Sequence, residues 1–152
     1  MFDYTLEHII SYWARIDRPQ LIGPTPEGMR AIFPVLEGEV TGPRFRGTVL
    51  RGGGDWLTVR ADGIQILDVR ATTRTDDGAL IYTEYTGVAD LGEDGYERFM
   101  RGDLDDTIPL RAGARFQTSD PRYAWLNRLQ CMLVGEADRA ESKVRFDVYA
   151  VR

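Results

Sequence analysis

Hydrophobic and polar residues alternate along this chain in short runs, and glycine-bearing turns separate the runs. The turn signals are Gly42-Pro43, Gly52-Gly53-Gly54, Ala61-Asp62-Gly63 and Asp76-Asp77-Gly78. A period of two is typical of strands with one buried face, and Asp-Gly pairs are typical of tight hairpin turns. The pattern therefore predicts antiparallel strands at about residues 44–50, 56–60, 64–74 and 79–87.

The N-terminal part of the chain is less regular. Residues 4–16 fit either a strand or one face of a helix, and their β-branched and aromatic side chains favour a strand. The sequence GPTPEG at 23–28 predicts a loop, because two prolines and two glycines oppose regular structure. In the strand candidate AIFPVLEGEV that follows, Pro34 predicts an edge or a bulge.

The C-terminal part returns to strands after one short helix. Residues 93–101 predict that helix, since its acids come early, its arginines come late and Gly102 follows it. We expect an irregular connection at 103–113 and a tight turn at Asp120-Pro121. Strands complete the chain at about residues 114–118, 128–135 and 143–151.

Together these segments predict one all-β domain that spans residues 1–152. Meandering hairpins are typical of a barrel or a sandwich. Acids and arginines at positions that would point inward favour a barrel with a polar-lined interior. We therefore expect a single antiparallel β-barrel with one short helix, whose interior holds a small organic molecule.

Composition and charge exclude several classes of protein. The net charge is −5, and the 19 basic residues, of which only Lys143 is a lysine, are scattered along the chain. An acidic chain without a basic stripe is a poor nucleic-acid binder. No run approaches the ~18 apolar residues of a membrane-spanning helix, and the first residues do not resemble a secretory signal. We expect a cytoplasmic protein with neither a nucleic-acid nor a membrane partner.

Cysteine and histidine offer little chemistry. Cys131 is the single cysteine and lies in the apolar run LQCMLV, which predicts a buried, inert thiol in a reducing compartment. The only histidine, His8, has no HxH or HExxH partner, and no GxSxG elbow occurs. We expect no metal, no cofactor and no nucleophilic triad.

The strand at 64–74 suggests a catalytic group. Asp68 and Arg70 are two positions apart and share one face of that strand. Across the following turn, Tyr82 and Glu84 share a face in the same way. If these faces meet inside a closed sheet, one carboxylate could act as an acid while Arg70 keeps the other ionised as a base. The same spacing also fits a solvent-exposed ion pair worth under about 1 kcal/mol, and the sequence leaves both placements open.

The glycine triplet at 52–54 leads into candidate binding residues. Asp55 and Trp56 follow it at the start of a strand, where Asp55 would stand at the barrel rim. Trp56 would form a ligand platform or a part of the core. A phosphate loop is disfavoured, because the lysine and the following helix of such loops are missing.

The segment SDPRYAWLN at 119–127 provides further candidates. Tyr123 and Trp125 could floor a pocket, and Asn127 could orient a substrate. The alternative is a structural plug, in which aromatic side chains close one end of the barrel and Asp120 and Asn127 bond to loop backbone.

Four stretches resemble one known family. They are GPRFRGTVLRGGGDW, RADGIQILDVRATTRTDDGALIY, FQTSDPRYAWLN and the closing DVYAV. From about Gly23 to Val151 the chain resembles the bacterial and fungal domain-of-unknown-function 3237 family. The resemblance implies a compact antiparallel β-barrel, similar in shape to allene oxide cyclase and dirigent barrels, but brings no established activity. It also leads us to expect an aromatic residue after Arg70, where this chain has Ala71, and an inward Ala71 would widen the cavity.

These features lead to one functional hypothesis and its alternatives. We expect a cofactor-free acid/base enzyme, an isomerase, cyclase or dehydratase, that acts on a small, largely apolar carbonyl-containing or polyketide-like molecule. Asp68 or Glu84 would transfer protons, Arg70 would polarise a carbonyl and Tyr82 would donate a hydrogen bond. A non-catalytic carrier or sensor barrel, or a protein-interaction module, fits the same pattern. Pro34 and the N-terminal strand suggest an open sheet edge that pairs in a homodimer.

Overall fold

Ten strands and two short helices make up a computed structural model of the protein, which describes all 152 residues. The strands are β1 (Leu6–Ile16), β2 (Gln20–Thr25), β3 (Gly28–Thr41), β4 (Gly47–Val49), β5 (Gly54–Val59), β6 (Ile64–Thr75), β7 (Leu80–Asp90), β8 (Thr107–Gln117), β9 (Cys131–Asp138) and β10 (Lys143–Val151). The helices are α1 (Gly95–Arg101) and η1 (Pro121–Arg128), of which the second is a 3-10 helix.

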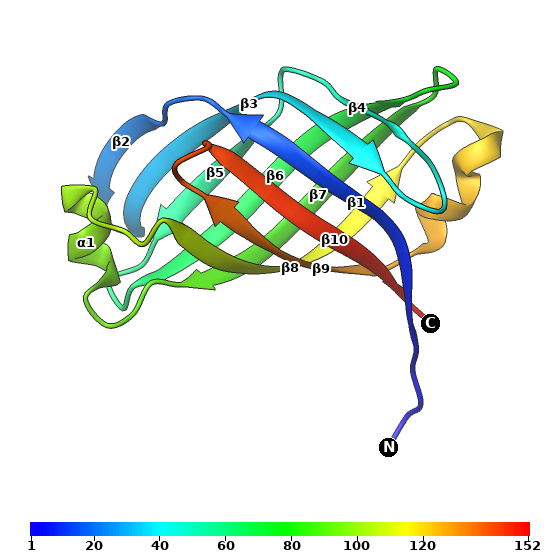
Figure 1. Ribbon diagram of the computed structural model, residues 1–152. Helices are drawn as coiled ribbons and strands as arrows, with labels where there is room; N and C mark the ends of the chain where they lie inside the picture. Colours follow the sequence, from blue (N-terminus) through cyan, green and yellow to red (C-terminus); the bar gives the residue numbers. More distant parts are fainter.

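The strands close into an antiparallel barrel (Figure 1). Neighbouring strands pair in the order β1-β10-β9-β8-β7-β6, and β3 joins the ends of this series. On one side β3 pairs with β1, and on the other it reaches β6 through β4 and β5, which share one position in the wall. The wall therefore has eight positions, and the predicted barrel is confirmed. β2 lies outside that count, since it pairs with β3 alone.

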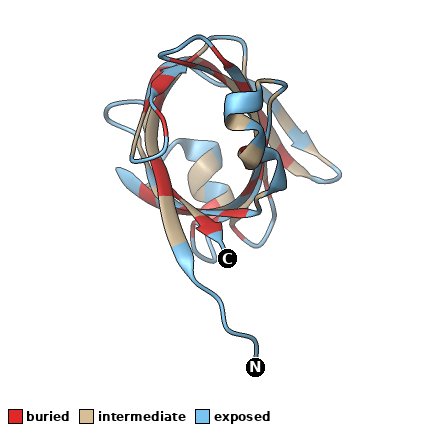
Figure 2. Ribbon diagram, turned by 90° about the vertical axis from the view of Figure 1, so that its right-hand side faces the viewer, coloured by how far each residue is buried: buried red, intermediate tan, exposed pale blue.

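Alternation along the strands sorts side chains to the inner and outer faces. In β6, Gln65, Leu67 and Val69 are buried, whereas the residues between them are more exposed. Of the 28 buried hydrophobic residues of the protein, 26 form one cluster. Figure 2 shows the strands as a ring, with buried segments around it. Full burial of a Leu or Ile side chain contributes roughly 1.5–3 kcal/mol, so this cluster is the main source of stability.

The two helices lie at opposite ends of the barrel (Figure 1). The helix predicted at 93–101 is confirmed as α1, and Gly102 ends it in the left-handed conformation with φ of 70°. At the other end, Leu126 of η1 is fully buried. The Asn127 side chain accepts a hydrogen bond from the Thr118 N–H (2.8 Å) and donates one to the Thr118 carbonyl (2.9 Å). These contacts fix η1 across the barrel end.

Several segments differ from the sequence prediction. Residues 20–25 form β2, which overlaps the loop predicted at 23–28, and its proline is tolerated because β2 is an edge strand. β8 covers 107–117, although the sequence predicts an irregular connection up to 113. Pro109 masks the strand pattern there, and it is accommodated because it pairs with β9 only. Residues 121–128, predicted only as a tight turn, form η1.

The open edge also lies elsewhere than predicted. β1 pairs with β10 along most of its length and with β3 from Ser11 to Ile16, so this half of the N-terminal strand is covered on both sides. Pro34 pairs with Gly54, and its carbonyl accepts the Asp17 N–H. β2 has a free edge along its whole length, since it pairs with β3 alone. Neither helix has the length and apolar character that crossing a bilayer requires.

Candidate functional site

The barrel encloses a cavity of about 170 Å³. Of the 27 residues that line it, 22 are hydrophobic. The polar exceptions are Asp55, Gln65, Thr73, Thr83 and Arg139. An engineered apolar cavity of ~150 Å³ holds a benzene molecule. The interior is therefore large enough for a molecule built on one aromatic ring.

Asp55 is the only carboxylate in the cavity lining. The glycines before it set its position. Gly52 has φ of 113°, which favours glycine, and a Cβ on Gly53 would lie 2.3 Å from the Arg70 carbonyl oxygen. The start of β5 can therefore lie close to β6. Alternation then directs Asp55 and Leu57 into the cavity, while Trp56 points outward.

The backbone of β6 fixes the Asp55 carboxylate. Pairing of β5 with β6 is interrupted between the Asp55–Val69 and Thr58–Ile66 pairs. Within that gap the Asp68 N–H donates to Asp55 Oδ1 at 2.9 Å. Burial raises the pKa of Asp55 to about 6, although this hydrogen bond opposes the rise. A carboxyl group with this pKa is mostly ionised at neutral pH and still exchanges its proton readily, as a general base or acid requires.

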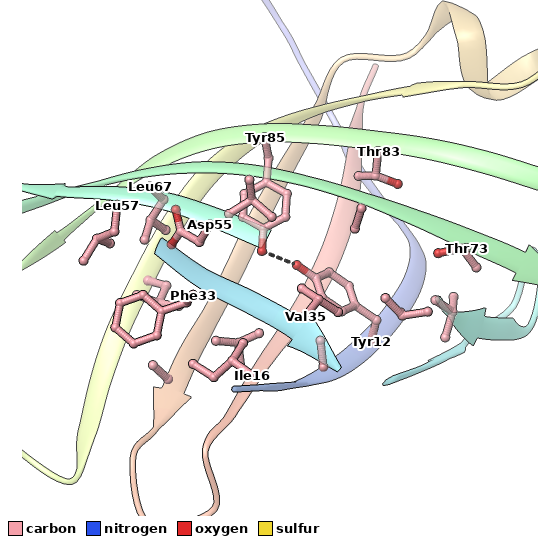
Figure 3. A pocket seen from close by; sticks show the side chains of 18 of the residues that line it. Tyr12, Ile16, Phe33, Val35, Asp55, Leu57, Leu67, Thr73, Thr83 and Tyr85 are labelled. Atoms are coloured by element: carbon pink, nitrogen blue, oxygen red, sulfur yellow. Dashed lines mark hydrogen bonds between the residues drawn. The ribbon is translucent and has the colours of Figure 1, made fainter. Parts of the chain in front are cut away.

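Two phenols meet across the cavity beside Asp55 (Figure 3). The Tyr12 hydroxyl donates to the Tyr85 hydroxyl at 2.9 Å, although β1 and β7 are not neighbours in the wall. Both rings pack against Phe146, with 5.5 Å between ring centroids in each pair. Burial raises the pKa of both phenols well above the usual range, and the Asp55 charge raises it further. Both hydroxyls therefore stay protonated at neutral pH.

The tyrosine pair keeps one hydrogen-bond donor free. Two hydroxyls carry two protons, and the hydrogen bond between Tyr12 and Tyr85 uses one of them. The other can be donated to an oxygen atom of a bound molecule. A carboxylate base and a phenol donor thus face the same small cavity.

The four residues predicted to converge inside the barrel lie on its outer face. None of them is in the cavity lining, and the side chains of Asp68 and Arg70 are 38% and 46% exposed. Their neighbours along the strands point inward instead, among them Leu67, Val69, Ile81 and Thr83. Folding buries the apolar face of each strand and leaves the charged face in water. Of the two placements that the sequence left open for Asp68, Arg70, Tyr82 and Glu84, the interior cluster on which the catalytic hypothesis depended is therefore wrong.

On the outer face these side chains bond to one another and to a neighbour. Asp68 Oδ1 lies 3.1 Å from Arg70 Nη1, and Glu84 Oε1 lies 2.6 Å from Arg115 Nη2. The Tyr82 hydroxyl donates to Glu84 Oε2 at 3.4 Å. Exposed pairs of this kind contribute under about 1 kcal/mol each. Asp68 and Arg70 therefore form the solvent-exposed ion pair that was the second interpretation of their spacing.

The predicted binding residues divide in the same way. Asp55 lines the cavity, although deeper than the rim position that the sequence predicts. Trp56 lies outside it, with the Arg70 guanidinium 5.3 Å from its ring centroid. Neither Tyr123 nor Trp125 lines the cavity.

The segment at 119–127 has the contacts of a structural plug. Tyr123 and Trp125 are partly buried and pack against the core. The Tyr123 hydroxyl donates to the Asp77 carboxylate at 3.0 Å, and the Asp120 carboxylate accepts the Arg122 N–H. Asn127 bonds to the backbone of Thr118, as described above. These side chains close the barrel end rather than floor the cavity.

Sequence reasoning missed Tyr12 and Tyr85. Alternation does place Tyr85 on one face with Ile81 and Thr83. Tyr12 and Tyr85 are nevertheless 73 residues apart in the sequence, and their hydrogen bond crosses the barrel. No local pattern in the sequence reveals such a contact. Ala71 lines the cavity as well, so its small side chain leaves room on this wall.

A serine, a histidine and an aspartate meet on β1 and β10 without the order of a catalytic triad. Ser11 Oγ lies 3.0 Å from His8 Nε2 and donates to Asp147 Oδ1 at 2.6 Å. The serine proton therefore goes to the carboxylate instead of the imidazole that would activate the hydroxyl. No group of three or more His, Cys, Asp or Glu side chains is arranged to hold a metal ion.

Comparison with known proteins finds relatives over the whole chain. A family model described as "Protein of unknown function (DUF3237)" matches residues 4–151. The UPF0311 protein RPA1785 of Rhodopseudomonas palustris is 34% identical over 151 residues, which cover 97% of each chain.

Solved structures share the barrel. A crystal structure of a protein with unknown function from Clostridium acetobutylicum ATCC 824 matches with a TM-score of 0.88 at 30% identity, over 99% of this chain and 100% of the other. A crystal structure of an enzyme from Penicillium herquei matches with a TM-score of 0.75 at 20% identity, over 100% of this chain and 97% of the other. At 20% identity the second likeness concerns the fold alone.

Proposed function

Because this chain belongs to the DUF3237 family, which is described as having unknown function, we propose a function from the cavity itself. The protein is a cofactor-free acid/base enzyme of the isomerase, cyclase or dehydratase type. Its substrate is a small, largely apolar molecule with a carbonyl group. Asp55 takes the proton-transfer role that the sequence suggests for Asp68 or Glu84, and the tyrosine pair replaces Arg70 and Tyr82.

The proposed reaction begins with proton removal by the Asp55 carboxylate from a carbon atom next to the carbonyl group. The C–H electron pair moves toward the carbonyl oxygen and forms an enolate. The free proton of the Tyr12–Tyr85 pair donates a hydrogen bond to that oxygen, where negative charge develops. The enolate electron pair then returns and the carbonyl group re-forms. In an isomerisation, protonated Asp55 gives the proton to the far carbon of a conjugated C=C bond, which shifts that double bond. In a dehydration, Asp55 gives the proton to a β-hydroxyl group, whose C–O bond breaks as a C=C bond forms and water leaves.

One observation carries this proposal: a single carboxylate with a raised pKa shares an apolar cavity with a phenol donor. A carboxylate is costly to bury without an opposite charge, so its presence in an apolar wall indicates a function. Electrostatic interactions are also stronger in a cavity of low polarity than in water. The likeness of the fold to an enzyme from Penicillium herquei is compatible with catalysis.

Hydrogen–deuterium exchange tests the proposal without knowledge of the natural substrate. Acetophenone is an aromatic ketone of suitable size, and proton NMR in D₂O follows the loss of its methyl protons. We expect the wild-type protein to accelerate this exchange. Asp55→Asn should lower the acceleration by at least about 10²-fold, in line with the usual contribution of a general base.

Glu84→Gln provides the matched control, because it removes a carboxylate from the outer wall. We expect this variant to exchange the methyl protons at the wild-type rate. Wild-type exchange by Asp55→Asn, or loss of exchange in Glu84→Gln, would contradict the assigned role of Asp55.

A non-catalytic binding barrel is the second candidate, and the 22 hydrophobic residues in the lining favour it. A carrier or sensor needs an apolar cavity but no proton transfer. Acetophenone that binds by calorimetry without faster exchange in the wild-type protein would support this function instead.

A further inference from the structure

Three threonines face inward on β6 and β7, and only one of them has its hydroxyl bonded within the protein. Thr75 donates to Asp77 Oδ1 at 2.6 Å and accepts the Ala79 N–H at 2.8 Å. Thr73 and Thr83 line the cavity, and neither hydroxyl forms a hydrogen bond with the protein. Thr73 is 6% exposed. No side-chain oxygen that is fully closed off lacks a hydrogen-bond partner. The unpartnered hydroxyls of Thr73 and Thr83 therefore remain accessible to a small molecule in the cavity that both residues line.

The two unpartnered hydroxyls belong to threonines on neighbouring strands. Thr73 pairs with Ile81 and Ala71 pairs with Thr83, so Thr73 and Thr83 are diagonal neighbours on one face of the sheet. The short side chain of Ala71 leaves room directly beside Thr83. Figure 3 shows both threonines beyond the tyrosine pair, on the side away from Asp55.

The strand register relates this corner to the proposed reaction centre. Asp55 pairs with Val69 and Val69 pairs with Tyr85, so the three lie in one row across β5, β6 and β7. Thr83 is two residues from Tyr85, which corresponds to roughly 7 Å along the strand. A ligand oxygen near Thr83 would therefore lie about one aromatic ring away from a ligand oxygen at the tyrosine pair.

Valine would fill the same space as threonine without an unpaired hydroxyl. The wall around these residues is apolar and includes Val49, Ile81 and Phe116. Threonine therefore packs no better than valine at these two positions. Its hydroxyl group, however, can donate and accept a hydrogen bond. A ligand with an oxygen substituent would supply the missing partner.

We propose that Thr73 and Thr83 form a second polar subsite that binds a hydroxyl or carbonyl group of the substrate. The substrate class is then a mainly apolar compound with two oxygen functions at opposite ends, such as a hydroxylated aromatic ketone. This inference rests on the proposed function, because that function places the carbonyl group of the substrate beside Asp55.

Binding of two matched probes tests the subsite. 4-Hydroxyacetophenone carries a hydroxyl group opposite its ketone, and 4-methylacetophenone has a methyl group of similar size in that place. By calorimetry we expect the wild-type protein to bind the hydroxyl compound about tenfold more tightly, the effect of one hydrogen bond. Thr73→Val and Thr83→Val should each reduce this preference and together abolish it, without weakening the methyl compound.

Thr72→Val is the control, because it makes the same substitution on the outer face of the same strand. We expect it to keep the tenfold preference. Equal affinity of the wild-type protein for the two probes would overturn the subsite, and so would failure of 4-hydroxyacetophenone to bind. A preference that persists in the double valine variant would also overturn it.

Asp55→Asn separates the subsite from the catalytic proposal. A variant that loses proton exchange but keeps the preference for 4-hydroxyacetophenone supports both proposals. If proton exchange survives while the preference depends on Thr73 and Thr83, the role of Asp55 fails and the subsite stands. If the preference disappears in Asp55→Asn and persists in the valine variants, the hydroxyl group binds at Asp55 and the subsite is overturned.

Discussion

Asp55 holds a carboxyl group inside an apolar cavity, and this placement links folding stability to pH. Its ordinary pKa is 3.8, and burial raises the pKa in the folded protein to about 6. Below pH 3.8 the group is neutral in both states. Between pH 3.8 and 6 the unfolded chain releases a proton that the folded protein still holds. Stability therefore falls as the pH rises through this window and stays lower above pH 6.

Asp55→Asn should accordingly stabilise the protein above pH 6. The rise in pKa from 3.8 to about 6 sets an upper bound of about 3 kcal/mol, and we expect a gain of about 1–3 kcal/mol in the free energy of unfolding. The asparagine oxygen can still accept the Asp68 N–H, so the comparison isolates the charge. Urea denaturation at about pH 8 measures the gain. At about pH 3 the variant should equal the wild type, and equal stabilities at both pH values would refute the raised pKa.

The sequence predicted Asp55 as a binding residue at the barrel rim, but it did not predict that its side chain lines the cavity. The glycine triplet before it lets β5 lie close to β6, since a Cβ on Gly53 would lie 2.3 Å from the Arg70 carbonyl oxygen. Whether Asp55 points inward depends on which of the two alternating sets of β5 side chains faces the core. The packing of all eight wall positions determines this. Asp68 and Arg70 were misplaced for the same reason, since alternation defines two faces but does not say which one is buried.

At the scale of elements, the cross-barrel contact between β1 and β7 shapes the site. Tyr12 and Tyr85 meet at 2.9 Å and enclose Phe146 in one aromatic group. Around these two residues both strands are paired on each side, β1 with β10 and β3 and β7 with β6 and β8. The two hydroxyls are therefore held at fixed positions, as stabilisation of a developing negative charge requires.

Phenylalanine variants test this contact. Either hydroxyl alone can donate its proton to the substrate oxygen, so we expect Tyr12→Phe and Tyr85→Phe each to lower the acetophenone exchange rate by about tenfold. The double variant lacks both donors and should lose roughly 10²–10³-fold. Tyr82→Phe, on the outer face of β7, should exchange at the wild-type rate. Wild-type exchange by the double variant would exclude the tyrosine pair from the reaction.

Elements joined by short turns were predictable, and elements with weak alternation were not. The Asp77-Gly78 turn gave the β6–β7 hairpin, because its signal is local and strong. β8 was partly hidden by Pro109 and by the small residues Ala112 and Gly113, which lack strand propensity. η1 was hidden because its helical turns depend on the burial of Leu126 in the barrel end.

At the scale of the whole molecule, closure of the barrel creates the cavity. The pairing of β1 with β3 joins the ends of the sheet and separates an inner face from an outer one. Most arginines and acids fall on the outside, and one carboxylate, Asp55, and one arginine, Arg139, line the cavity. Composition and family resemblance supported a barrel, but only the register assigns each side chain to a face. The homodimer expected from the sequence stays a prediction, and β2 offers the free edge for it.

The pH dependence of acetophenone exchange tests the central claim most directly. If Asp55 is the base, the rate must follow its ionisation, because only the carboxylate form accepts a proton. We predict that exchange by the wild-type protein rises with pH, reaches a plateau, and has its midpoint near pH 6, the pKa of Asp55. Asp55→Asn should show no such rise above the background in buffer. A wild-type midpoint near 3.8, or the same profile in Asp55→Asn, would contradict the account.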